Sequence, residues 1–204
     1  MTSAAQPSDA AELSATSIVE GGVKLGLITA VGTAAFALGS RTIDGPAEVA
    51  FQSLLVLLGG ALFSYLPAIW LKPSNVDSIA WASLVGLLGA LTFTVVDTAI
   101  LRPLGTYHWT WDQIGGGSGF WYTPVWWMGA TTLAWLGAWI YGAAAKAGPV
   151  NVAALVGRSW MIALVLFAIA GLARVGPFGS AMMALAFGVA LVVQGVLATT
   201  LLRK

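Results

Sequence analysis

Few residues of this chain are of a type that carries out chemistry. The sequence has a single histidine, His108, no cysteine and only eight acidic residues in 204. This composition excludes metal sites built from several histidines, and it excludes haem or iron–sulfur centres held by thiolates. We therefore expect neither a bound metal nor a cofactor, and we assign no catalytic residue.

Asp97 is the one carboxylate that lies well inside an apolar stretch. A carboxylate in a membrane is costly, so it should face protein or water rather than lipid. Arg102 and Arg174 are its candidate ion-pair partners, while Phe93 and Thr94 share its helical face. A structural ion pair is the default interpretation. The alternatives are an anchor for the polar head of a ligand and a catalytic acid.

A second candidate is an aromatic face that also carries hydroxyl groups. Trp135 and Trp139 are four residues apart, with two threonines and a methionine nearby. Large rings beside a hydroxyl and a flexible thioether suit a hydrophobic ligand with a small polar head. The alternative is that both indoles simply pack against neighbouring helices. The candidate lipid-binding residues are therefore Phe93, Asp97, Met128, Thr131, Thr132, Trp135 and Trp139.

The segment between residues 101 and 119 could also be interpreted as a catalytic loop. His108 lies close to Asp112, and such a pair can exchange protons. The glycine-rich run at 115–119 argues against this, because catalysis needs side chains held by rigid elements. The run also lacks the strand and the Lys-Ser/Thr pair of a phosphate-binding loop. We interpret the segment as a lid over one end of the protein.

The candidate residues must be positioned by membrane helices, because the composition excludes the other classes of protein. The chain is 58% hydrophobic and 8% charged, whereas a soluble domain has about 25% charged residues. It therefore fits neither a water-soluble globule nor a disordered chain, and without cysteine it is no disulfide scaffold. Its net charge of +1 does not indicate the strongly basic surface that binds nucleic acid.

Six apolar stretches are long enough to cross a bilayer, which takes about 20 residues. They are 21–39, 47–71, 78–100, 120–145, 152–172 and 178–202. We expect residues 1–20 to form a solvated tail and residues 21–204 a single domain. Four of the five connections are short, so consecutive helices should run antiparallel in a compact all-α bundle of six transmembrane helices. The apolar spans carry lone amides at Gln52 and Gln194, where we expect interhelical hydrogen bonds.

The distribution of basic residues predicts the orientation in the membrane. Six of them lie on the side of the two termini, namely Lys24, Lys72, Lys146, Arg158, Arg203 and Lys204. Three lie on the opposite side, namely Arg41, Arg102 and Arg174. Because positive charge is retained in the cytoplasm, both termini are expected to be cytoplasmic.

Glycines such as Gly86 and Gly137 allow helices to approach closely in lipid. Such contacts can form within one chain, which is the default interpretation, or between copies in a homo-oligomer.

The stretch from Thr131 to Trp139 is similar to a threonine-leucine-alanine stretch that runs into tryptophan in the Insig family. The number of spans, the size and the expected cytoplasmic termini also resemble that family. Met128 stands where the family has a glutamine, and Ala145 and Lys146 stand where it has an acid. The resemblance implies a lipid-binding bundle with a cavity for a glyceride or sterol-like lipid, acting as a sensor or regulator.

A second resemblance is to the membrane-embedded carotenoid cyclases and hydratases. It rests on Asp97 followed by Pro103, Gly105, Trp109 and the Tyr-Thr-Pro triplet at 122–124. The acidic pair of that family is missing after the proline, so protonation of a polyene would rest on Asp97 alone. We therefore rank lipid binding first and this enzyme activity as the alternative.

Overall fold

The structure is a computed structural model that describes residues 15–106, 119–175 and 179–201, without the side chains of residues 119–123 and 201. This part of the chain is all-helical, as the sequence predicts. The helices are α1 (Ala15–Thr42), α2 (Pro46–Leu71), α3 (Val76–Val96), the π-helical turn η1 (Asp97–Leu101), α5 (Gly119–Ala145), α6 (Val152–Leu172) and α7 (Ser180–Leu201). His108 and Asp112 of the predicted lid lie outside the described residues.

Local sequence signals set the helix ends. Gly45 has a positive φ of 69° and is followed by Pro46 in the first turn of α2, where proline costs no hydrogen bond. Asn75 and Ser78 form a reciprocal capping box at the start of α3, and Asn151 caps α6 through the backbone N–H of Ala154. These signals were visible in the sequence, which explains why the predicted spans lie close to the helices.

Helix α1 begins earlier than the sequence predicts. Residues 15–20 were expected to belong to a solvated tail, but they form the first turns of the helix. Ile18 explains the difference, because it is buried in a cluster with Leu25, Phe63 and Val85. Packing of this side chain therefore extends the helix beyond the span that hydropathy alone marks.

In the part of the chain that the structure describes, five helices are long and apolar enough to cross a membrane: α1, α2, α3 with η1, α6 and α7. The chain is thus a membrane-spanning helical protein by the length and composition of its helices. Helix α5 is 27 residues long and carries no charged residue. Its tryptophan, tyrosine and glycine content gives it a lower hydropathy than the other five.

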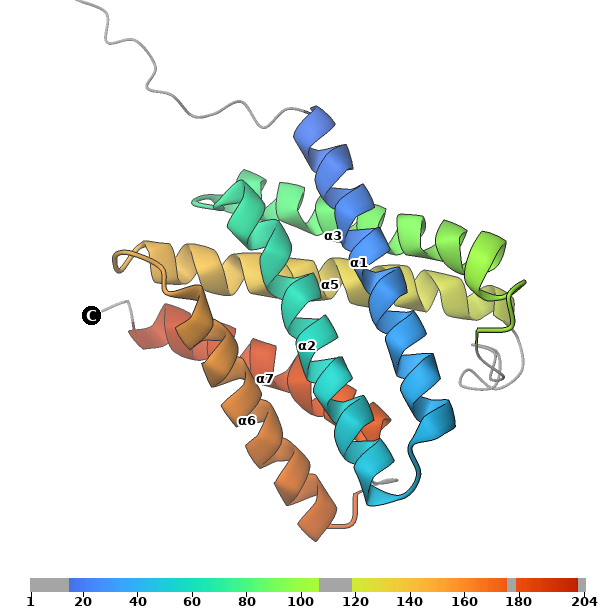
Figure 1. Cartoon of the computed structure of the whole chain (residues 1–204). Helices are drawn as coiled ribbons and strands as arrows, with labels where there is room; N and C mark the ends of the chain where they lie inside the picture. Colours follow the sequence, from blue (N-terminus) through green and yellow to red (C-terminus); the bar gives the residue numbers. More distant parts are fainter. Residues whose placement is uncertain (1–14, 107–118, 176–178, 202–204) are drawn as a thin grey trace, which may run out of the picture.

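The helices form two crossing layers (Figure 1). Helices α1, α2 and α6 form one layer, and α3, α5 and α7 cross it to form the other. Across the layers α1 packs on α3, α2 on α5, and α6 on α7. Helix α5 lies centrally, because it contacts α3, α2 and α7.

Small residues allow the layers to approach each other. A Cβ added at Gly86 of α3 would overlap Ala134 of α5, and one added at Gly137 of α5 would overlap the backbone of Ser64 in α2. Both glycines therefore serve packing within the chain, which was the default interpretation of these small residues. Helices in lipid associate through such close packing, because the hydrophobic effect does not drive apolar helices together in an apolar environment.

A buried polar cluster joins α2, α6 and α7. The Tyr65 hydroxyl lies 2.8 Å from Ser159 Oγ, and Ser159 Oγ donates to Gln194 Oε1 at 2.5 Å. The Gln194 amide donates to the carbonyl of Leu155, and Trp160 Nε1 donates to the carbonyl of Leu57. The interhelical bond predicted for Gln194 is confirmed. The one predicted for Gln52 is also confirmed, since its amide donates to Ser40 of α1.

Candidate functional site

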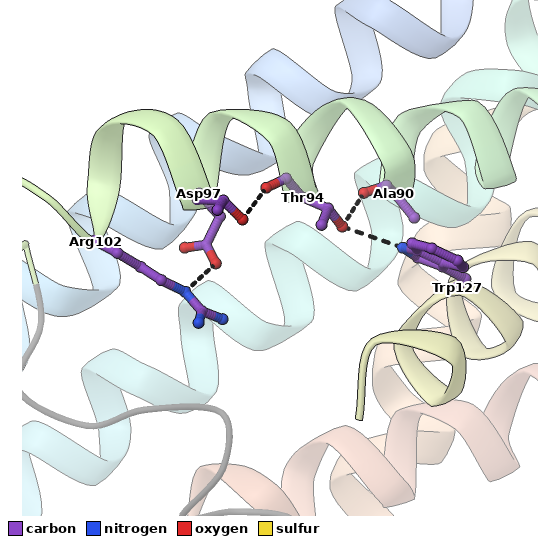
Figure 2. A network of polar contacts seen from close by, with 6 residues as sticks. Ala90, Thr94, Asp97, Arg102 and Trp127 are labelled. Carbon is purple, nitrogen blue, oxygen red and sulfur yellow. Dashed lines mark hydrogen bonds and ion pairs between the residues drawn. The ribbon is translucent and has the colours of Figure 1, made fainter. Parts of the chain in front are cut away.

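Asp97 begins the π-helical turn η1 at the end of α3, and it is 2% exposed. Arg102 Nε donates to Asp97 Oδ2 at 2.9 Å, which confirms the ion pair predicted with Arg102 (Figure 2). The backbone N–H of Arg102 also bonds the carbonyl of Asp97, five residues earlier. In an α-helix, residues five apart point about 140° away from each other. The wider π turn brings the carboxylate and the guanidinium to the same side.

One oxygen of this carboxylate remains without a partner. Asp97 Oδ1 is buried and accepts no hydrogen bond among the described residues. The Asp97 side chain is 4% exposed, whereas the Arg102 side chain is 42% exposed. The ion pair therefore runs from the interior towards the surface, with the carboxylate inside. π-Helical turns of this kind often occur at functional sites.

A hydrogen bond joins the Asp97 region to α5. Trp127 Nε1 donates to Thr94 Oγ1 at 3.1 Å, and Thr94 Oγ1 donates to the carbonyl of Ala90 (Figure 2). Thr94 is three residues before Asp97, on the same side of α3. The bond therefore holds the first half of α5 against α3, about one helical turn from Asp97.

The predicted aromatic face of α5 is split between the interior and the surface. Trp135 and Trp139 stack with ring centroids 5.6 Å apart at an interplanar angle of 26°. Trp139 packs against the largest core cluster, and its ring fills the place that a side chain at Gly195 would occupy. Trp135 is 44% exposed. One indole is therefore packed core, and the other lies on the outer surface.

The remaining predicted residues on α5 share the outer surface with Trp135. Met128 is 70% exposed, and Thr132 is exposed beside it. The Thr132 hydroxyl donates to the carbonyl of Met128 at 2.8 Å, and that of Thr131 donates to Trp127 at 2.7 Å. Each hydroxyl donates its one proton to a backbone carbonyl of α5. Its oxygen can therefore act only as an acceptor towards any further group.

The structure therefore does not gather the seven predicted residues at one place. Phe93 packs against Ala30, Ala37 and Leu101, which belong to α1 and η1. Two shallow surface hollows of the described residues lie away from α5. They adjoin each other along the start of α1, and the smaller one, of about 200 Å³, reaches Trp81, Leu84 and Leu88 of α3.

Sequence reasoning missed three groups of residues that make contacts between helices. The indole N–H of Trp127 on α5 donates to Thr94 of α3. Arg41 was counted only for topology, but its guanidinium donates to the carbonyl of Gly105. Tyr65 and Ser159, which join α2 to α6, were not singled out. Each contact joins residues far apart in the chain, so no local spacing signals it.

We compared the chain with models of protein families, with curated proteins and with solved structures, and none of them matches it.

Proposed function

We propose that this chain is an integral membrane lipid-binding protein whose ligand lies against the outer face of α5. The face is defined by Met128, Thr132 and Trp135. The observation that carries the proposal is the exposed indole of Trp135 in the inner part of an uncharged helix. Trp135 lies ten residues from the end of α5, which is about 15 Å along the axis. The preference of tryptophan for the headgroup region does not account for an indole at this depth.

The chemistry of the face suits an apolar lipid with a hydroxyl group. The Trp135 ring rests on Trp139, which the core holds in place, so a flat or extended apolar body meets a rigid surface. The Thr132 oxygen can accept one more hydrogen bond but has no proton left to donate. A ligand hydroxyl would supply that proton, and glycerides and sterol-like lipids carry one. The resemblance to the Insig family adds a sensing or regulatory role to this proposal.

Replacing Trp135 with alanine tests the lipid-binding face. We expect the variant to stay folded and to lose most of the lipid that co-purifies with the wild type. The half-exposed ring contributes less to stability than a packed one, whose removal costs about 3–5 kcal/mol. Lipid mass spectrometry and thermal melting of the detergent-purified proteins measure the two effects.

Trp81→Ala on α3 is the matched control, because Trp81 is 43% exposed but lies outside the face. It should keep the lipid. A destabilised Trp135→Ala protein that still carries its lipid would assign Trp135 to packing. A carotenoid as the stoichiometric lipid would favour the alternative function, an enzyme that uses Asp97.

We also propose that α5 is a sixth span and that both termini are cytoplasmic. The proposal rests on the excess of basic residues at the end of the bundle that carries Lys72 and Lys146. The chain has no native cysteine, so single cysteines report their side of the membrane cleanly. A cysteine at Ser74 should react with an impermeant thiol reagent from the cytoplasmic side, and one at Asp44 from the opposite side. The reverse pattern would show the opposite orientation, and labelling of both from one side would show that α2 does not cross the membrane. A cysteine at Ala147 that reacts only from the side opposite Ser74 would contradict α5 as a span.

A further inference from the structure

Two arginines from different helices meet at the turn that follows η1. Arg41, in the last turn of α1, donates from its guanidinium to the carbonyl of Gly105. The N–H of Gly105 bonds the carbonyl of Arg102 at 2.9 Å, and the N–H of Thr106 bonds that of Leu101 at 3.0 Å. Gly105 adopts a positive φ of 59°, which closes the turn. One tight turn thus connects both arginines, and we call this place the arginine corner.

Among the described residues, each guanidinium is held by one fixed acceptor and has further N–H donors without a partner. Arg102 bonds Asp97 through Nε, and neither of its Nη atoms has a partner among the described residues. Arg41 bonds the Gly105 carbonyl through a single Nη atom, and its side chain is exposed. A guanidinium carries five N–H donors in a fixed plane. The corner therefore presents oriented, unused donors at its surface, and the buried Asp97 fixes the plane of one of them.

Acidic residues follow Arg41 closely in the sequence. Asp44 is exposed in the short connection between α1 and α2, and Glu48 in the first turn of α2 accepts from Gln52 at 2.8 Å. The arginine corner thus has acidic residues close to it in the sequence. It sits where α1 and η1, two apolar elements, end together. In a bilayer this is the level of the lipid headgroups.

We propose that the arginine corner binds the headgroup of a zwitterionic phospholipid. Arginine binds phosphate through paired N–H donors with charge-assisted hydrogen bonds, so Arg102 and Arg41 take the phosphodiester. Asp44, an exposed acid three residues after Arg41 in the chain, is the residue that we assign to the ammonium group of the same headgroup. Asp97 acts as a positioning residue, because it contacts Arg102 and not the lipid. The proposal does not depend on lipid binding at α5.

Native mass spectrometry of the detergent-purified full chain tests the proposal. The probes are dioleoyl-phosphatidylethanolamine, dioleoylglycerol with the same acyl chains but no phosphate, and inorganic phosphate. In Trp135→Ala, which lacks the glyceride site proposed on α5, the phospholipid should be retained in preference to the other two. Arg102→Lys and Arg41→Gln should each weaken its retention by about tenfold, the effect of losing one charged hydrogen bond of about 1.4 kcal/mol.

Two controls keep the result interpretable. Arg102→Lys retains a cation beside the buried carboxylate, so it should fold where a neutral residue would not. Arg174→Gln removes an exposed arginine outside the corner and should leave retention unchanged. Trp135→Ala should also leave it unchanged, which separates this site from the one on α5.

Three outcomes would overturn the proposal. The first is equal retention of the phospholipid by wild type, Arg102→Lys and Arg41→Gln. The second is retention of dioleoylglycerol that falls in Arg102→Lys and Arg41→Gln as much as that of the phospholipid, which would show that the phosphate is not recognised. The third is binding of inorganic phosphate with the same dependence on the arginines, which would make the corner a site for soluble anions.

Discussion

Replacing Gly137 with alanine is expected to cost at least about 3 kcal/mol of stability, at the upper end of what overpacking of a core usually costs. The added Cβ would overlap the carbonyl group of Ser64, which is backbone of α2. A side chain could rotate away, but a backbone carbonyl can yield only if α2 and α5 separate. That separation would also loosen the cluster in which Leu57, Tyr65, Leu136 and Ile140 are buried. Thermal melting in detergent, followed by circular dichroism, measures the loss.

Gly129→Ala on the same helix is the matched control. A Cβ at Gly129 meets no atom within 4 Å. Alanine is the better helix former by about 1 kcal/mol, so this variant should melt at or slightly above the wild-type temperature. If Gly137→Ala and Gly129→Ala have the same melting temperature, α2 and α5 do not approach each other as closely as described.

Replacing Ser159 with alanine is expected to destabilise the protein by about 2 kcal/mol. The Ser159 hydroxyl lies between the Tyr65 hydroxyl and the Gln194 amide, and it is fully buried. Its loss leaves two buried polar groups each short of a partner, and one such group costs about 1–3 kcal/mol. Because these bonds join α6 and α7 to α2, the loss should weaken the attachment of that pair of helices.

Ser83→Ala is the control for Ser159→Ala, since the Ser83 hydroxyl bonds only the carbonyl of Ile79 in its own helix. Its effect should stay within about 0.5 kcal/mol. Tyr65→Phe combined with Ser159→Ala should cost less than the sum of the two single changes, because the groups share one network. Additive effects of the two changes would show that they act independently.

The ion pair at the end of α3 shows where sequence reasoning succeeds and where it stops. The pairing of Asp97 with Arg102 could be predicted, since an acid in an apolar span needs a nearby cation. The π turn that makes the pairing possible could not, because the spacing of five residues is unfavourable in the regular helix assumed from hydropathy. The unpartnered oxygen of Asp97 likewise becomes visible only when the neighbours of the carboxylate are known.

The aromatic face shows the same limit. The spacing of Trp135 and Trp139 predicts that they share a face, and they stack. Which ring enters the core depends on α7, whose Gly195 leaves room for Trp139 alone. Helical periodicity describes neighbours along one helix and carries no information about the helix that packs against it.

The sequence by itself determined the all-α membrane class, because long apolar stretches with 8% charged residues have no other stable form. It also determined the starts of α2, α3 and α6, since Gly45-Pro46, Asn75 and Asn151 act on the backbone within a few residues. The tertiary structure decided the crossing of the two layers, the polar cluster around Ser159 and the meeting of Arg41 with Arg102. These features depend on contacts between residues distant in the chain, and in an apolar bundle many helix faces are alike until close packing and a few buried hydrogen bonds select among them.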